Sequence, residues 1–206
     1  MALANFSDLK TSIAGWLGRS DLTSVIPDFI TLAEARFNRV LRTPDMETAG
    51  TVSASSESTA LPSGFLEMRS AWREDSPDAP LDYFPPSHLR TMRAAAQSGT
   101  PTAYTIVGGN IILAPTPAAT ETIGLYYYTK VVALSDSATT NWLLTAHPDL
   151  YLFASLAAAE VYGWHDERLP LLKAGADEIM EQINDAGKKR RAGGAPLQQR
   201  AATAYR

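Results

Sequence analysis

The sequence contains no cysteine among its 206 residues. Disulfide bonds and thiolate metal sites are therefore excluded, and the composition does not indicate an oxidising compartment. The N-terminus, MALANFSDLK, lacks a basic stretch followed by an apolar run, so we expect no secretory signal peptide. No run of ~20 uninterrupted apolar residues occurs, and we therefore expect no transmembrane helix.

Charged residues are also scarce, because they make up 19% of the chain while hydrophobic residues make up 45%. Soluble domains usually contain roughly 25% charged residues. The hydrophobic share predicts a folded core, and the low charge indicates surface that is covered by partners. Between Ala94 and Thr129 the only charged residue is Glu121. We expect this stretch to lie against neighbouring subunits.

The charges that are present are distributed unevenly along the chain. The net charge of -4 does not favour general coating of nucleic acid. All acidic residues nevertheless precede Lys188, and the chain from there to its end contains only basic charges. A basic end on an acidic body predicts a terminal segment that docks elsewhere.

The hydrophobic period changes twice along the chain. Residues 5–43 and 137–191 show helical spacing, whereas residues 44–136 are rich in Thr, Ser, Val, Gly and Pro. In the middle part, Gly108 and Gly109 predict a tight hairpin turn, and residues 87–96 predict one short helix. The runs that predict strands there are 48–53, 65–72, 81–84, 103–107, 111–114 and 122–132.

The two outer parts predict a helical bundle. Two amphipathic helices precede the β-rich part and two follow it, and four apolar stripes can be buried together. The expected fold class is therefore α+β: a bundle of about four helices (5–43 and 137–191) with an inserted β-rich domain (44–136). Residues 192–206 are expected to form an extended docking tail. The last two stripes include Leu156, Ala157, Val161, Leu172, Ala176, Met180, Ile183 and Ala186.

No catalytic or cofactor motif is found in the sequence. It contains no phosphate-binding loop, no G-x-G-x-x-G, no G-x-S-x-G elbow and no H-E-x-x-H. His165, Asp166 and Glu167 are adjacent, but side chains next to each other on a helix do not converge on one ion. The sequence therefore predicts no catalytic residue, no metal site and no cofactor.

Glu160 is the acidic residue that needs a partner. Its spacing places it beside Ala157 and Val161 on an apolar stripe, where a lone carboxylate is costly. We predict that Arg36, on the second helix, forms a structural ion pair with Glu160. A catalytic acid is the alternative, and it would require a second group and a cleft.

Two further groups of side chains have alternative interpretations. In the strand that contains Tyr126, Tyr127 and Tyr128, alternation predicts that the first and third tyrosines share one face. Strand packing is the favoured role, and a stacking platform for sugars or bases is the alternative. The cluster Lys188, Lys189, Arg190 and Arg191 could bind DNA, but four basic residues give only weak, salt-sensitive binding.

We therefore favour protein docking for the C-terminal residues. Extended recognition segments combine a few apolar anchors with polar positions. The candidate docking residues, on a partner protein or on a neighbouring subunit, are Lys188, Lys189, Arg190, Arg191, Pro196, Leu197, Arg200 and Tyr205.

Four stretches of the sequence resemble one known protein family. They are ITLAEARFNRVLRTPDME from Ile30, LPSGFLEMRSA from Leu61, YYYTKVVALSDSATTNWLL from Tyr126 and HPDLYLFASLAAAEVYG from His147. In this order they resemble segments of head-to-tail adaptor proteins of tailed bacteriophages, a group similar to the tubular gatekeeper proteins of short-tailed phages. The resemblance spans about residues 5–191.

The resemblance implies a structural virion protein without enzymatic activity or cofactors. It implies a homo-oligomeric, twelvefold ring in the neck of the virion, assembled in the host cytoplasm. Its partners would be the portal protein and a tail or nozzle protein, and DNA would pass through the channel without sequence-specific binding. A carbohydrate-binding or other tail-associated module remains the alternative.

Overall fold

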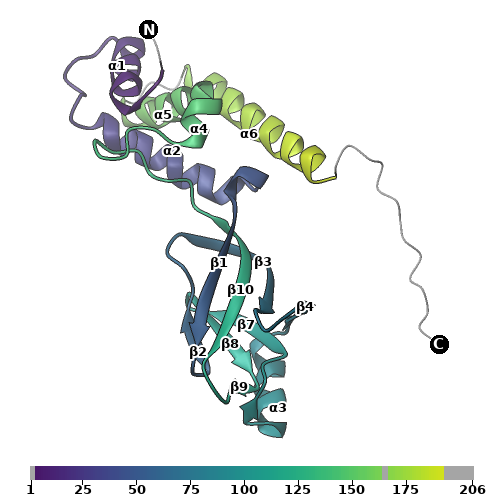
Figure 1. Cartoon of the computed structure of the whole chain (residues 1–206). Helices are drawn as coiled ribbons and strands as arrows, with labels where there is room; N and C mark the ends of the chain where they lie inside the picture. The colour runs from purple at the N-terminus through teal and green to yellow at the C-terminus, as the bar shows by residue number, and fades with distance from the viewer. Residues whose placement is uncertain (1–2, 164–166, 193–206) are drawn as a thin grey trace. The chain divides into compact units, whose positions relative to one another are not determined.

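A computed structural model describes residues 3–163 and 167–192 of the chain. The chain forms two compact units, each described here by itself. The first unit contains the residues up to Asp45 and those from Val131 onward, and the second contains Met46–Lys130. The first is helical and the second is β-rich (Figure 1). The predicted α+β class is therefore confirmed.

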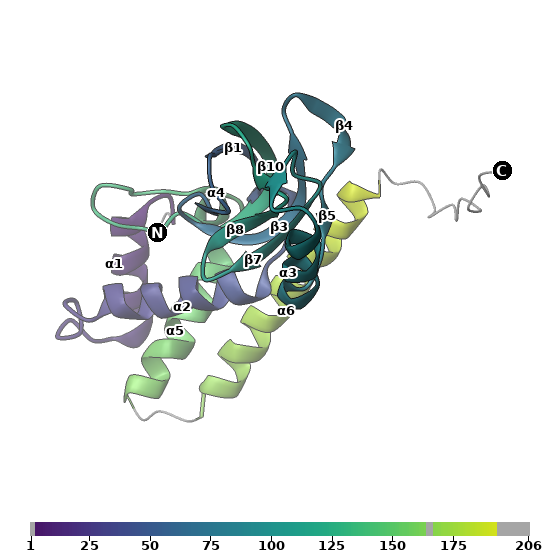
Figure 2. The same ribbon diagram turned by 90° about the horizontal axis from the view of Figure 1, so that it is seen from below.

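Helix α5 is the central element of the helical unit. It contacts each of the other four helices described there; α6 runs beside it and α2 crosses it (Figure 2). Four of the five described helices correspond to the predicted amphipathic helices, and α4 is a short additional helix. The bounds are α1 (Phe6–Leu17), α2 (Ile26–Val40), α4 (Trp142–Ala146), α5 (Pro148–Gly163) and α6 (Leu169–Arg191).

Local signals in the sequence account for the helix ends. Asn5 and Asn141 cap α1 and α4, because the side chain of each accepts a hydrogen bond from a backbone N–H of the first turn. Gly18 ends α1 with a φ of 63°, a conformation that glycine adopts without strain. Pro27 lies in the first turn of α2, where its missing N–H costs no hydrogen bond.

The predicted stripes form most of the helical core, although Trp16, Val161 and Ala186 are exceptions. Val161 was expected inside but is 63% exposed. Successive residues of a helix point about 100° apart, so the end of α5 buries Glu160 and turns Val161 outward. In α6, Ala186 was expected inside, but Gly187 is the buried residue, because α6 there packs closely against Thr43.

The β-rich unit spans Met46–Lys130, whereas the sequence predicts residues 44–136. The chain returns to the helical unit at Val131 rather than at residue 137. The backbone N–H of Val131 donates to Asn38 at 2.8 Å, and that of Leu134 donates to Glu34 at 2.8 Å. These contacts with α2 attach the segment 131–136 to the helices.

Glu34 is the centre of a buried hydrogen-bond chain. Its Oε1 also accepts a bond from the Tyr151 hydroxyl at 3.1 Å, and that hydroxyl accepts one from Asn141 at 2.7 Å. Glu34 is only 5% exposed, and this burial raises the pKa of its carboxyl group, although the bonds from Leu134 and Tyr151 oppose the shift. The chain joins α2, α5 and the returning segment.

We expect Glu34→Gln to gain stability relative to the wild type as the pH rises. A carboxyl group whose pKa is raised on folding stabilises the fold at low pH, and this contribution is lost as the pH passes the folded pKa. Glutamine keeps the oxygen that accepts both hydrogen bonds and carries no charge. Urea unfolding of both proteins from about pH 4 to about pH 8 measures the difference.

Tyr151→Phe is the matched variant, because it keeps the ring and removes one hydroxyl of the chain. It should lower the free energy of unfolding by about 1–3 kcal/mol, since Asn141 then has a donor without this acceptor. A free-energy difference between Glu34→Gln and wild type that stays constant across the pH range would contradict the proposed role of Glu34.

The β-rich unit contains two four-stranded sheets. The first has the order β1 (Glu47–Ala54), β10 (Glu121–Thr129), β3 (Phe65–Arg73) and β4 (Ser76–Pro80), with antiparallel neighbours. The second has the order β2 (Ser58–Ala60), β8 (Asn110–Ala114), β7 (Ala103–Val107) and β5 (Asp82–Tyr83). Two short pieces, β6 (Ser98–Gly99) and β9 (Thr116–Pro117), pair with each other, and a 3-10 turn, η1 (Pro44–Met46), precedes β1.

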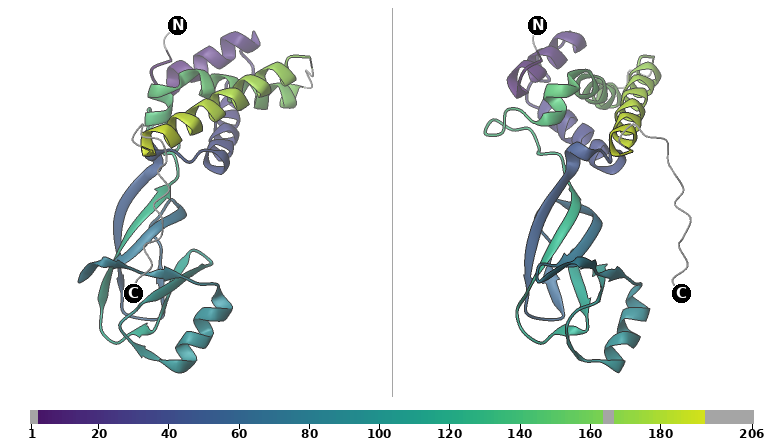
Figure 3. Two further views of the ribbon diagram at one scale, coloured as in Figure 1. Left: turned by 90° about the vertical axis from the view of Figure 1, so that its right-hand side faces the viewer. Right: turned by 45° about the vertical axis from the view of Figure 1, so that its right-hand side comes forward.

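The two sheets share one apolar cluster. It includes Val52 and Ile123 of the first sheet and Ile111 and Leu113 of the second. Helix α3 (Pro86–Ala95) lies against β7 and β8 and buries Leu89 (Figure 3). The strands β7, β8 and β10 are all internal to their sheets. The unit's own core thus accounts for much of the uncharged stretch that was expected to contact neighbouring subunits.

The tyrosine triplet follows the predicted alternation of strand faces. Ile123, Leu125 and Tyr127 belong to the apolar cluster that the two sheets share, and they recur at intervals of two along β10. Tyr126 and Tyr128 therefore lie on the other face of the strand, although Tyr126 is 52% exposed and Tyr128 is buried. The register between β10 and β3 shifts between Tyr126 and Tyr127, but the extra residue, Arg69, lies in β3 and leaves the alternation of β10 intact.

Candidate functional site

The ionisable side chains of the described residues form pairs rather than a catalytic or metal-binding cluster. In residues 3–163 and 167–192, no group of three or more His, Asp or Glu side chains could hold a metal ion. Across the same residues, no helix has the length and apolar character needed to cross a membrane.

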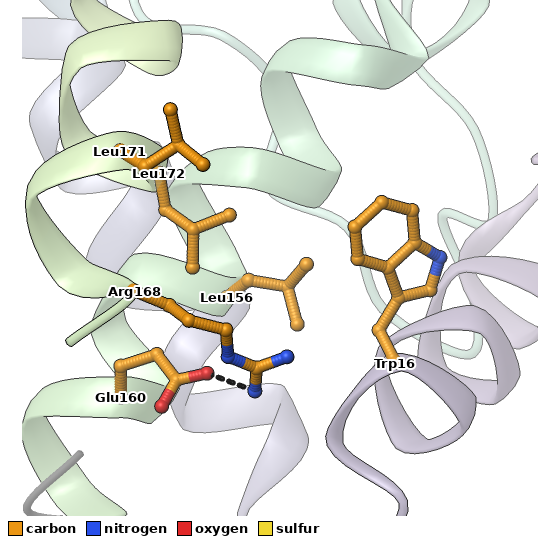
Figure 4. A pocket seen from close by; sticks show the side chains of 6 residues that line it. All are labelled: Trp16, Leu156, Glu160, Arg168, Leu171 and Leu172. Atoms are coloured by element: carbon orange, nitrogen blue, oxygen red, sulfur yellow. Dashed lines mark hydrogen bonds and ion pairs between the residues drawn. The ribbon is translucent and has the colours of Figure 1, made fainter.

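Glu160 forms an ion pair, but not with the predicted residue. Its carboxylate contacts the guanidinium of Arg168, which directly precedes α6 (Figure 4). Arg36 instead pairs with Asp177 and joins α2 to α6. The predicted pair was wrong, because the rotation of α2 points Arg36 toward α6 and leaves Glu160 at the far end of α5.

The two side chains of the Glu160–Arg168 pair differ in their exposure to solvent. The Glu160 side chain is fully buried, whereas that of Arg168 is 55% exposed. The second carboxylate oxygen, Oε2, has no hydrogen-bond partner among the described residues. The other residues that line the small pocket around the pair, of about 100 Å³, are apolar: Trp16, Leu156, Leu171 and Leu172. Among the residues that the structure describes, the lining of the pocket contains one carboxylate and no second acid, whereas acid–base hydrolysis needs paired groups.

A larger groove adjoins this pocket and shares Trp16, Leu171 and Leu172 with it. We call it the α1–α6 groove. It has a volume of about 400 Å³ and is also lined by Phe153 of α5 and by Ala174, Gly175 and Glu178 of α6. The ring of Trp16 meets that of Phe153 edge-on, with centroids 6.4 Å apart. The groove is therefore a mostly apolar trough between α1, α5 and α6.

The apolar residues of the groove are unusually accessible. Leu171 is 77% exposed and Trp16 is 50% exposed. Isolated exposed apolar side chains are common, but several gathered around one concave surface indicate a protein-interaction site. Tryptophan in particular is enriched among the residues that dominate binding energy. The described part of the helical unit thus presents a candidate docking site.

The basic cluster at the end of α6 is largely engaged within its own unit. Lys188 pairs with Asp185 at 2.8 Å, and Arg190 pairs with Asp45. These contacts lower the pKa of both aspartates, chiefly through the hydrogen bonds that the cations donate. Arg191 donates to the backbone carbonyl of Arg42. The remaining candidate docking residues, Pro196, Leu197, Arg200 and Tyr205, lie outside the described residues.

A comparison with protein families identifies the relatives of this two-unit chain. The family model of the SU10 adaptor protein matches residues 4–200. The chain belongs to the SU10 adaptor protein family. The match spans both units and confirms the resemblance to phage adaptor proteins that four segments of the sequence indicate. A search of curated proteins finds no match.

Family membership indicates a structural role for this adaptor. The Glu160–Arg168 pair then serves as an internal contact that holds the start of α6 against the end of α5. The exposed groove beside the pair is therefore the main candidate for a docking surface. Sequence reasoning missed it, although the adjacent leucines 171 and 172 contained a signal, since neighbouring residues cannot both face one core.

We expect Arg168→Ala to lower the free energy of unfolding of the adaptor by about 1–3 kcal/mol. The substitution leaves the buried carboxylate of Glu160 without its cation. The loss should fall below the 3–5 kcal/mol typical of a fully buried pair, because Arg168 is more than half exposed and water screens its charge. Urea unfolding at neutral pH measures the effect.

The double variant Arg168→Ala/Glu160→Gln should recover part of this loss, since it removes the unpaired charge. Arg36→Ala is the control, because its partner Asp177 is half exposed and such pairs contribute about 1 kcal/mol or less. A double variant as unstable as the single one would show that Arg168 acts through packing rather than through its charge.

Proposed function

We propose that this adaptor assembles as a homo-oligomeric ring between the portal and the tail of a phage and lines the DNA exit channel. The proposal rests chiefly on the match to the SU10 adaptor family over residues 4–200. Twelve copies are proposed, following the resemblance to head-to-tail adaptors. The virion neck would be the site of action, after assembly in the host cytoplasm.

The α1–α6 groove supports an assembly role over a catalytic one. Its exposed Trp16 and Leu171 suit contact with protein, and no pair of catalytic carboxylates accompanies them. If the groove of one copy receives a different surface of the next copy, the contact is heterologous, and such contacts close into rings when the rotation fits.

The charge of the chain also suits a channel through which DNA passes. A protein that binds DNA tightly neutralises phosphates with many cations. This adaptor has a net charge of -4, and several cations of α6 are already paired with carboxylates of the helical unit. An acidic protein would repel the phosphates and let the DNA slide without sequence-specific binding.

The C-terminal residues 192–206 are proposed to dock on the portal or on a neighbouring subunit. The family match extends to residue 200 and thus includes part of this segment. Because Lys188 and Arg190 have partners within the helical unit, the docking contacts would fall to Pro196, Leu197, Arg200 and Tyr205.

We expect the full chain to form rings that join the cognate portal protein. Negative-stain imaging and native mass spectrometry of the chain, alone and mixed with portal, measure ring order and complex formation. A chain truncated after Ala192 should keep its circular dichroism spectrum and lose portal attachment. A full chain that remains monomeric with and without portal would overturn the ring, and a truncated chain that attaches normally would overturn the role of the tail.

Carbohydrate binding remains the second candidate, because one aromatic pair is accessible on the β-rich unit. The rings of Trp72 and Tyr126 lie 4.6 Å apart, and Tyr126 is half exposed. Trp72 lies over Gly124, where any side chain would collide with the indole. Such a platform can stack on a sugar ring, but subunit contact would use the same surface.

A glycan array tests this candidate directly. The ring proposal predicts no glycan signal above that of Tyr126→Ala, whereas a sugar platform predicts a signal that Tyr126→Ala abolishes. Tyr83→Ala is the matched control, since Tyr83 is equally accessible, at 58% exposure, and lies on the other sheet. Loss of a glycan signal in Tyr126→Ala alone would favour carbohydrate binding.

A further inference from the structure

We propose that the α1–α6 groove binds the C-terminal segment, residues 193–206, of a neighbouring copy of the same chain. This inference rests on the proposed assembly into rings, because it requires an adjacent copy. It goes further by naming both sides of one contact between copies: Trp16, Leu171 and Leu172 as the acceptor, and the segment around Leu197 and Tyr205 as the ligand.

The groove sets three requirements for whatever fills it. Its exposed Trp16 and Leu171 require apolar anchors. Glu178 places one carboxylate in the lining of the groove, and the buried Oε2 of Glu160, which has no hydrogen-bond partner among the described residues, lies in the adjoining pocket. The occupant should therefore combine apolar side chains with N–H donors and should contain no acidic side chain, since the carboxylate of Glu178 would repel it.

The volume of the groove limits the size of its occupant. About 400 Å³ lies near the lower end of the range of small-molecule pockets, roughly 300–1,000 Å³. It accepts a few side chains of an extended segment and is too small for a folded domain. Extended segments bind in this way when alternate side chains enter pockets along a surface.

The C-terminal segment meets these requirements by composition. Its sequence, GGAPLQQRAATAYR, offers Pro196, Leu197 and Tyr205 as apolar anchors. Two glutamines and two arginines supply N–H donors, and the segment contains no aspartate or glutamate side chain. The segment thus combines apolar anchors with exclusively positive side-chain charge, and the groove presents the carboxylate of Glu178 to it.

The reach of the segment favours a neighbouring copy over the same molecule. Leu171 precedes Ala192 by 21 helical positions, about 30 Å at 1.5 Å per residue. Leu197 follows Ala192 by five residues, which span at most about 18 Å when fully extended. Leu197 therefore cannot reach Leu171 of its own α6, although Tyr205, which follows Ala192 by 13 residues, could. A second copy can bring its groove within range of both Leu197 and Tyr205.

This arrangement gives each copy one donor and one acceptor. The donor segment follows the last turn of α6, and the acceptor lies along the first turns of the same helix. Repetition of a head-to-tail contact produces a closed ring or a filament, depending on the rotation between copies. The contact would thus link successive copies of the proposed ring.

Cysteine crosslinking tests the contact in the complete chain. The natural sequence contains no cysteine, so an introduced pair reports only on itself. We would mix two single variants, Leu171→Cys and Leu197→Cys, under mild oxidation and analyse them on a non-reducing gel. A disulfide between the two variants can only join different molecules. We expect a crosslinked dimer in the mixture, and a ladder of higher species from the double variant.

Leu32→Cys provides the matched control for the acceptor. Leu32 is also an exposed helical leucine, at 59%, but it lies on α2 and does not line the groove. Mixed with Leu197→Cys, it should give no crosslink above background. A crosslink of equal yield at Leu32 would overturn the assignment, because it would show non-specific contact of the segment.

A second measurement uses substitutions at exposed positions that the fold tolerates. Leu171→Glu should weaken association between copies roughly tenfold or more, as loss of a central apolar anchor does, whereas Leu32→Glu should leave it unchanged. Sedimentation measures the association, and circular dichroism checks that both variants are folded.

The outcomes separate this inference from the proposed function. Rings that form and join portal, but ignore Leu171→Glu and give no 171–197 crosslink, would overturn the groove contact and leave the adaptor role intact. Loss of portal attachment in Leu197→Glu, with no crosslink between Leu197→Cys and Leu171→Cys, would overturn it in favour of portal docking. A chain that neither forms rings nor joins portal would overturn both.

Discussion

The helical unit depends on the burial of α5, which every other described helix of that unit contacts. Its small residues, such as Ala154, Ser155 and Ala157, let the neighbouring helices approach closely. The same burial brings Tyr151 against α2 and makes its hydroxyl part of the hydrogen-bond chain through Glu34. Because that hydrogen-bond chain also holds residues 131–136, the position of α5 fixes the segment that follows the β-rich unit in sequence.

Local signals made the main elements predictable. The caps at Asn5 and Asn141, the turn at Gly108 and Gly109, and the apolar period of each long helix act within a few residues, so the sequence alone indicates them. The strands β2, β6 and β9 have only two or three residues each, too few to show alternation. The alternation of the tyrosine triplet was predictable, but the burial of Tyr128 and the extra residue of β3 depend on neighbouring segments, which composition does not reveal.

The pairing of charges and the groove depend on packing between helices that are distant in sequence. Periodicity correctly placed Glu160 in the interior, but the choice between Arg36 and Arg168 depends on the rotation of α2 about its axis. Trp16 continues the stripe of α1, yet half of its surface stays open because Phe153 meets only the edge of its ring. Glu34 was missed although it also lies on the apolar stripe of α2, between Ile30 and Phe37, and its donors Leu134 and Tyr151 are distant in sequence.

The attachment of the β-rich unit has a consequence for how such chains can evolve. The unit leaves and rejoins the helices through β1 and β10, which pair directly, with Glu47 opposite Tyr128. Paired residues of antiparallel strands have Cα atoms only about 4.5–5.5 Å apart. A whole insert could therefore be exchanged for another, or removed and replaced by a tight turn, without altering the path of the helices. Recombination between phages could in this way change one half of the molecule while the other half keeps its partners.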